Sequence, residues 1–295
     1  MEKIDFVFQT DSQVIEDTYS ENPNYLIEYS DNNKLGDKYC ILYFSSNDIY
    51  FPNDEQSFRD QLLKKNKFEW YNTRIEKGEK HIFLRDIKKQ WYLTGINQKI
   101  NTIEKLYQFL QTETNGYKII ALGSSAGGFA AVLIGSMLNA EIIYTFNGQF
   151  MLSDLLSSSS KKYSSARIDP IIYREQNNPE INQYYSLRPY IKNAKSIYYF
   201  YSDRSNWDLD QFNHVSDFKI QFIPFRTSHH GIPFLRTNLK RILNKPTEQL
   251  QGFIGKVNNP FLFSIKIDGL FKTTKDIASL VLKLISRKIL TQKLS

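Results

Sequence analysis

KIIALGSSAGGFAAVLIG, residues 118–135, is the stretch that decides the fold of this chain. Residues 119–122 form a short apolar run of strand type, and residues 129–138 have helical spacing and small side chains. Between them, residues 123–127 fit G-x-S-x-G with Ser125 at the centre. A strand, a very tight turn and a helix in this order predict a nucleophile elbow, whose glycines make room for a strained serine.

The alternative for this stretch is an ordinary turn rich in glycine and serine that binds a phosphate or nothing. A dinucleotide-binding loop fits poorly because G-x-G-x-x-G is absent, and no Gly-Lys-Ser/Thr closes a phosphate-binding loop of the Walker type. The elbow is therefore the preferred interpretation.

Length and composition bound the class of protein. The 295 residues have room for one large α/β domain or two small ones, and 41% hydrophobic residues support a real core. The net charge of +7 favours acidic partners such as an anionic glycan, an anionic lipid or a phosphate-bearing cofactor. Nucleic acid is disfavoured, because the lysines are spread along the chain and no nucleic-acid-binding motif occurs.

Cysteine use and apolar runs exclude further classes. Cys40 is the single cysteine, so an internal disulfide is impossible and no zinc cluster of cysteine and histidine is expected. The first residues lack the apolar stretch of a signal peptide, and no apolar run is long enough to span a bilayer. We expect a cytoplasmic protein without a metal.

The order of apolar runs predicts an α/β fold with a mostly parallel central sheet, helices on both faces and right-handed crossovers. Expected strands cover residues 6–8, 25–29, 39–44, 81–84, 119–122, 141–146, 197–201 and 220–225, and expected helices cover 58–65, 101–110, 129–138 and 234–244. Residues 150–195 lack long periodicity and are expected to form a small cap. The catalytic domain is expected over residues 1–250, with a helical tail over 251–295.

A serine needs a base within hydrogen-bond reach, and the base needs an orienting acid. Ser125, Asp203 and His230 occur in that order, each just past an apolar strand-like run. Asp208 is the alternative acid and His229 the alternative base.

Two loops are expected beside the serine. The backbone N–H of Ala126 is a candidate oxyanion donor, with a second from Ser45 or Ser46 in the loop after an early strand. A plain turn is the other interpretation of the second loop. Trp91 and Tyr92 lie in an aromatic loop near the same end of the sheet, and we expect them to bind substrate and help to exclude water.

Three motifs together resemble a known family. LGSSAGG at 122–128, YFYSDRSNWD at 199–208 and SHHGIP at 228–233 are similar to those of α/β-hydrolase-fold O-acetyltransferases of bacterial capsular polysaccharide synthesis. The resemblance covers roughly residues 39–235. It implies acetyl-CoA as the acyl donor, a hydroxyl of a capsular or surface polysaccharide as the acceptor, and Ser125, Asp203 and His230 as the triad.

Two other functions remain open from the sequence. A carboxylesterase or thioesterase would use the same triad. A non-catalytic protein on a hydrolase-like scaffold could take part in polysaccharide assembly or secretion, and would not need Ser125.

The C-terminal residues differ in character from the rest. Leu280, Leu284 and Ile285 recur at helical spacing, and Lys283 and Arg287 add positive charge. Such a basic amphipathic helix can lie on an anionic membrane or against a partner, here the inner-membrane surface or a capsule-assembly complex. It can equally pack on its own domain. The expected location is thus cytoplasmic, with peripheral attachment to the inner membrane as one variant.

Overall fold

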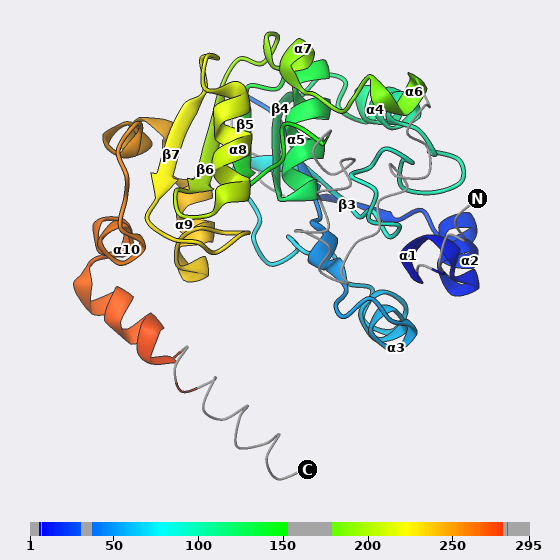
Figure 1. Ribbon diagram of the computed structural model, residues 1–295, viewed down its shortest axis with the longest axis horizontal. Helices are drawn as coiled ribbons and strands as arrows, with labels where there is room; N and C mark the ends of the chain where they lie inside the picture. The colour runs from blue at the N-terminus through cyan, green and yellow to red at the C-terminus, as the bar shows by residue number, and fades with distance from the viewer. Residues whose placement is uncertain (1–5, 7, 31–36, 153–178, 280–281, 283–295) are drawn as a thin grey trace.

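A seven-stranded sheet forms the centre of the computed structural model, which describes residues 6, 8–30, 37–152, 179–279 and 282 (Figure 1). The strand order is β1-β3-β2-β4-β5-β6-β7, and only the pair β1 and β3 is antiparallel. The strands are β1 (Tyr25–Tyr29), β2 (Tyr39–Phe44), β3 (Gly78–Leu84), β4 (Lys118–Ser124), β5 (Ile142–Phe146), β6 (Ile197–Ser202) and β7 (Gln221–Phe225). The predicted α/β-hydrolase-like, mostly parallel sheet is confirmed.

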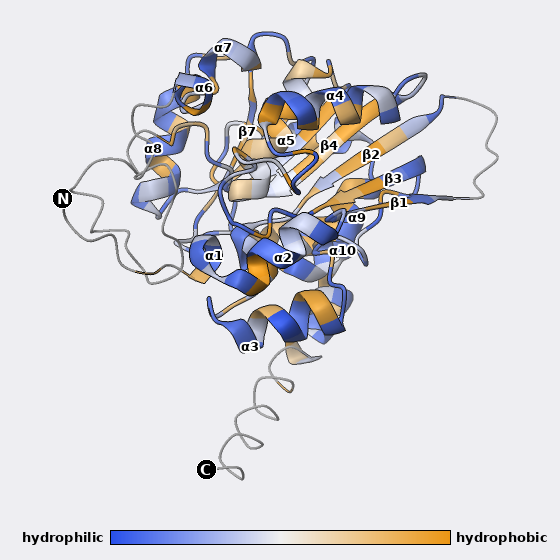
Figure 2. Cartoon of the chain, turned by 90° about the vertical axis from the view of Figure 1, so that its right-hand side faces the viewer, coloured by the Kyte–Doolittle hydropathy of each residue, from blue (hydrophilic) through white to orange (hydrophobic). Residues whose placement is uncertain are grey.

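Helices cover both faces of this sheet because successive strand side chains point to opposite sides. Leu42 and Ala121 face one core, and Ile41 and Ile120 face the other. The first core is closed by α4 (Ile103–Glu113), α5 (Ala126–Met137), α7 (Arg188–Ile191) and α8 (Asn206–Val215). The second is closed by α9 (Leu239–Asn244) and α10 (Pro260–Asp268). Figure 2 shows strongly apolar strands in the middle of the molecule, with helices that carry both polar and apolar residues around them.

The N-terminal residues differ from the prediction. A strand was expected over residues 6–8, but Phe8 begins the short helix α1 (Phe8–Asp11), followed by α2 (Gln13–Glu21). The ring of Phe8 packs edge-on against Tyr50 and Phe58, in a separate small core that also buries Ile15. Phe8 thus contributes to this small core from a helix and not from a strand of the sheet. Phe58 ends α3 (Glu55–Phe58), and a wider helical turn continues over Arg59–Lys64.

Short elements complete the described chain. Turns of 3-10 helix occur at Asn47–Ile49, Arg236–Asn238 and Thr247–Phe253, and α6 covers Pro179–Asn182. Residues 153–178, most of the expected cap, lie outside the described residues. The same holds for residues 280–281 and 283–295 of the expected tail. In the part of the chain that the structure describes, no helix combines the length and the apolar character needed to cross a membrane.

The segment after residue 250 packs against the sheet. Phe263 and Ile267 of α10 are buried in the second core, and Asp268 forms an ion pair with Arg241, with 2.5 Å between Oδ1 and Nη1. The chain through Asp268 is therefore continuous with the main body, whereas Leu270 and Phe271 beyond it are 59% and 83% exposed.

Glycines permit the close approach of β2, β4 and α5 at the predicted elbow. A Cβ atom added to Gly123 would lie 2.0 Å from the carbonyl oxygen of Gly127. One added to Gly127 would lie 2.3 Å from the carbonyl oxygen of Phe44. Both obstacles are backbone atoms, which cannot rotate away. The first turn of α5 can thus sit against the ends of β2 and β4 only if these positions carry no side chain.

We predict that Gly123→Ala destabilises the fold by roughly 2–4 kcal/mol, because the methyl group forces α5 away from β4. Gly252→Ala is the matched control, since its added Cβ meets nothing within 4 Å, and its effect should stay within about 0.5 kcal/mol. Urea unfolding followed by circular dichroism measures both. Equal stabilities of the two variants would contradict this account of the elbow.

Candidate active site

Ser125 occupies the turn between β4 and α5 in a strained conformation. Its φ and ψ angles are 53° and −122°, outside the regions that side chains with a Cβ favour. Its backbone N–H donates to the carbonyl of Phe146 at 3.0 Å, which ties the turn to the end of β5. Ser125 is partly exposed while its neighbours Ser124 and Ala126 are buried. The turn therefore presents one hydroxyl at the carboxyl edge of the sheet.

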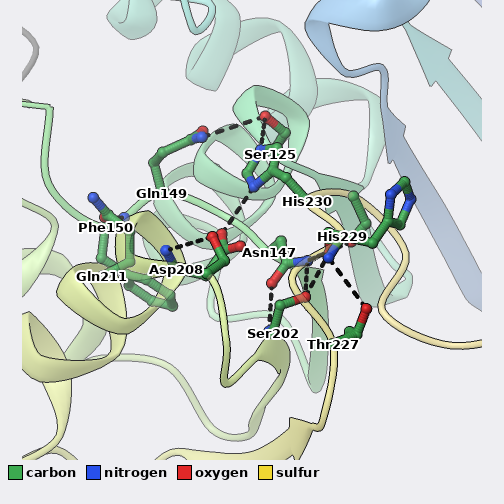
Figure 3. Close-up of polar contacts among 12 residues, drawn as sticks. Ser125, Asn147, Gln149, Phe150, Ser202, Asp208, Gln211, Thr227, His229 and His230 are labelled. Carbon is green, nitrogen blue, oxygen red and sulfur yellow. Dashed lines mark hydrogen bonds and ion pairs between the residues drawn. The ribbon is translucent and has the colours of Figure 1, made fainter. Parts of the chain in front are cut away.

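His230 and Asp208 extend from this hydroxyl in a continuous hydrogen-bonded line (Figure 3). His230 Nε2 lies 2.9 Å from Ser125 Oγ, and His230 Nδ1 lies 2.8 Å from Asp208 Oδ1. The Asp208 side chain is 1% exposed and the His230 side chain 30%. The indole of Trp207 stacks on the imidazole, with ring centroids 4.9 Å apart and an angle of 5° between the planes. The imidazole is thus held at its edge by a carboxylate and on its face by a ring.

The carboxylate that contacts His230 is Asp208, the alternative, and not Asp203. Asp203 directly follows β6, and its backbone N–H donates to the carbonyl of Phe225 on β7 at 2.9 Å, so it lies at the same end of the sheet. Asp208 lies in the first turn of α8, where the chain turns back toward His230. Of the histidine pair, His230 is the residue whose imidazole contacts Ser125, and His229 is exposed.

Two polar side chains that the sequence analysis missed fix the histidine loop. Asn147, just after β5, donates through Nδ2 to the carbonyls of His229 and Gly231 at 3.1 and 3.0 Å. Ser202 at the end of β6 donates through Oγ to the His229 carbonyl at 2.6 Å. Hydrogen bonds to the carbonyls of its two neighbours in the chain, His229 and Gly231, therefore fix the backbone on both sides of His230. Both residues follow apolar strands, which is the signal that could have found them.

The backbone N–H groups predicted as oxyanion donors differ in their hydrogen-bond partners. Ala126 is the first residue of α5, where a backbone N–H has no acceptor within its own helix. The two predicted donors after β2 are engaged elsewhere: Ser45 N–H donates to the carbonyl of Leu84 at 3.1 Å, and Ser46 N–H to a carboxylate oxygen of Glu69 at 2.5 Å. Burial raises the pKa of Glu69 above its usual range, although the hydrogen bonds from Ser46 oppose this.

Trp91 and Tyr92 do not line a surface as we expected. Their side chains are 1% and 0% exposed, so they offer no area to a substrate and support the site from within. Tyr92 Oη contacts the Ser45 hydroxyl and carbonyl, both at 3.1 Å. Trp91 Nε1 donates at 3.1 Å to Oε1 of Gln149, and Gln149 Nε2 donates at 3.3 Å to Ser125 Oγ.

No group of histidine, cysteine, aspartate and glutamate side chains in the described ranges is arranged to hold a metal ion. The described site brings a serine hydroxyl, an imidazole and a buried carboxylate into one hydrogen-bonded line, next to the first backbone N–H of α5. Such an arrangement suits covalent acyl transfer through a serine.

The solved structures that resemble this chain share little of its sequence. No protein-family model matches the sequence, and no curated protein matches it. A capsule O-acetyltransferase of Neisseria meningitidis serogroup A is 18% identical, with 69% of this chain and 83% of that chain covered and a TM-score of 0.45. An esterase B from Lactobacillus rhamnosis is 9% identical, with 94% of this chain and 87% of that chain covered and a TM-score of 0.45. The fluorophosphonate-binding serine hydrolase F of Staphylococcus aureus is 10% identical, with 74% of this chain and 96% of that chain covered and a TM-score of 0.42. By their names, these neighbours are an acetyltransferase, an esterase and a serine hydrolase.

We predict that Asp208→Asn lowers kcat for 4-nitrophenyl acetate by about 10³- to 10⁴-fold, because the amide no longer stabilises the imidazolium or fixes its tautomer. Asp203→Asn is the matched control, and its kcat should stay within about threefold of the wild-type value. The reverse pattern would assign the acid to Asp203 and contradict the geometry described above.

Proposed function

We propose that this chain is an O-acetyltransferase that moves an acetyl group from acetyl-CoA to a hydroxyl of a bacterial capsular or surface polysaccharide. The observation that carries the acyl-transfer part is the line from Ser125 Oγ through His230 to Asp208, with separations of 2.9 and 2.8 Å. The choice of donor and acceptor is supported by the three sequence motifs that resemble capsular polysaccharide O-acetyltransferases.

The first half-reaction acylates Ser125. His230 Nε2 takes the hydroxyl proton while Oγ forms a bond to the thioester carbonyl carbon, and the carbonyl electron pair moves onto oxygen. Asp208, buried and bonded to Nδ1, stabilises the imidazolium that results. When the intermediate collapses, the carbonyl double bond re-forms and the carbon–sulfur bond breaks. The sulfur takes the proton from His230, and coenzyme A leaves as the free thiol. The product is acetyl-Ser125.

The second half-reaction reverses these roles. A sugar hydroxyl loses its proton to His230 Nε2 and attacks the acetyl carbon, and Ser125 regains the proton as it leaves. Transfer exceeds hydrolysis only when the acceptor is bound and water is excluded. The net charge of +7 suits the phosphates of coenzyme A and an anionic glycan.

The partner and location predictions are kept as part of this proposal. An anionic polysaccharide remains the proposed acceptor, and nucleic acid is not proposed. The exposed apolar residues Leu262, Leu270 and Phe271 lie with Lys266 and Lys272 on α10 and just after it, a combination that suits attachment to an anionic membrane surface or a capsule-assembly complex.

Mass spectrometry after mixing with acetyl-CoA tests the proposal. We expect the intact protein to gain the mass of one acetyl group, located on Ser125 by peptide mapping, and an acidic capsular oligosaccharide to receive it. Release of coenzyme A should speed up at least about tenfold with the acceptor present, because deacylation by water is slower than transfer. Ser125→Ala is the control and should show neither product.

Two outcomes would replace the proposal. Release of coenzyme A at one rate with and without oligosaccharide would identify a thioesterase or esterase. A Ser125→Ala protein that still supports polysaccharide acetylation would identify a non-catalytic interaction protein.

A further inference from the structure

The loop after β2, where the second oxyanion donor was expected, has no free backbone N–H at Ser45 or Ser46. Ser45 N–H donates to the carbonyl of Leu84 on β3, and Ser46 N–H donates to the carboxylate of Glu69. Glu69 is held there by its neighbours in the chain, since Phe68 and Trp70 are both buried, and Trp70 Nε1 donates to the Phe44 carbonyl at 2.7 Å. With its hydrogen bond to Glu69, the Ser46 N–H is already engaged and does not point to an incoming substrate oxygen.

Gln149 supplies a different donor. It follows β5 by three residues, its side chain is buried, and its Nε2 lies 3.3 Å from Ser125 Oγ. Ser125 directs its own proton to His230 Nε2, so the hydroxyl oxygen accepts from Gln149. The amide nitrogen is thus already aimed at the atom that attacks the substrate (Figure 3).

Trp91 settles which end of the Gln149 amide faces the nucleophile. An indole N–H only donates, and Trp91 Nε1 lies 3.1 Å from Gln149 Oε1. The amide oxygen must therefore face Trp91, which leaves the NH₂ group toward Ser125. A flipped amide would place two donors face to face at Trp91.

The loop that carries Trp91 is strained, and Asp86 holds it. Lys89, Trp91 and Tyr92 have φ angles of 55°, 53° and 62°, and each such residue costs of the order of 1–3 kcal/mol. Asp86 Oδ2 accepts from the backbone N–H groups of Gln90 and Tyr92 at 2.6 and 2.9 Å. Burial raises the pKa of Asp86 to about 6, while these backbone hydrogen bonds lower it. In this loop conformation the indole of Trp91 is buried and reaches Gln149.

We propose that the side-chain amide of Gln149 completes the oxyanion hole together with the backbone N–H of Ala126. The proposal rests on the acyl-transfer function proposed above. When Ser125 Oγ bonds to the carbonyl carbon, the oxygen that takes the electron pair lies one carbon away from Oγ. A donor within reach of Oγ is then positioned for that oxygen. Trp91 acts as a positioning residue, because it contacts only Gln149 within this line.

Steady-state kinetics with 4-nitrophenyl acetate test the role of Gln149. Gln149→Met keeps the length of the side chain and removes the N–H donor, so kcat should fall about 10²- to 10³-fold with KM within about threefold. Trp91→Phe keeps an aromatic ring and frees the amide to rotate, so kcat should fall about tenfold. Gln9→Met is the matched control, because Gln9 is a buried glutamine of α1 at another place in the fold, and its kcat should match the wild type.

The outcomes separate this role from the proposed function. A wild-type protein whose Ser125 is not acylated overturns both. A reactive wild type with a folded Gln149→Met variant that keeps kcat within about threefold overturns the role of Gln149 alone. A Glu69→Ala variant that gains tenfold or more in kcat, beside an unaffected Gln149→Met variant, would assign the donor to the Ser46 amide instead. Thermal melting of each variant establishes that it is folded.

Discussion

The strained backbone of Ser125 is the constraint on which the rest of the site depends. A side chain at φ 53° and ψ −122° is held only when its surroundings leave no alternative. Gly123 and Gly127 provide part of these surroundings, because their backbones pack so closely that an added Cβ atom would overlap neighbouring backbone atoms. The hydrogen bond from Ser125 N–H to the end of β5 provides the rest. The hydroxyl gains its exposure, and its position at the first turn of α5, from this packing.

The other parts of the site come from distant segments that meet at one edge of the sheet. β5 leads to Asn147 and Gln149, β6 leads to Ser202 and α8, and β7 leads to His230. Asn147 and Ser202 bind the carbonyls on each side of the histidine, so three strand ends fix one imidazole. A parallel sheet makes such convergence possible because its carboxyl ends lie along the same edge.

Much of this arrangement was predictable because it rests on local patterns. Apolar runs of strand length, separated by helical spacing, led to a mostly parallel sheet with helices on both faces, and the glycine spacing led to Ser125. The acid was ranked wrongly, because order along the chain places Asp203 and Asp208 near the same strand end but does not say which side chain turns toward His230. Trp91 was expected at a surface. Its side chain is buried in a loop of left-handed backbone angles, in which Asp86 accepts from Tyr92 N–H, and residue preferences do not reveal such a conformation.

The central claim is that Ser125 reacts as a nucleophile under the control of His230 and Asp208. Covalent labelling of the folded protein with a fluorophosphonate, followed by peptide mapping, tests it most directly. The account predicts one label, on Ser125, and loss of labelling in His230→Ala. Absence of the label in the folded wild type, or equal labelling of the His230→Ala protein, would contradict it.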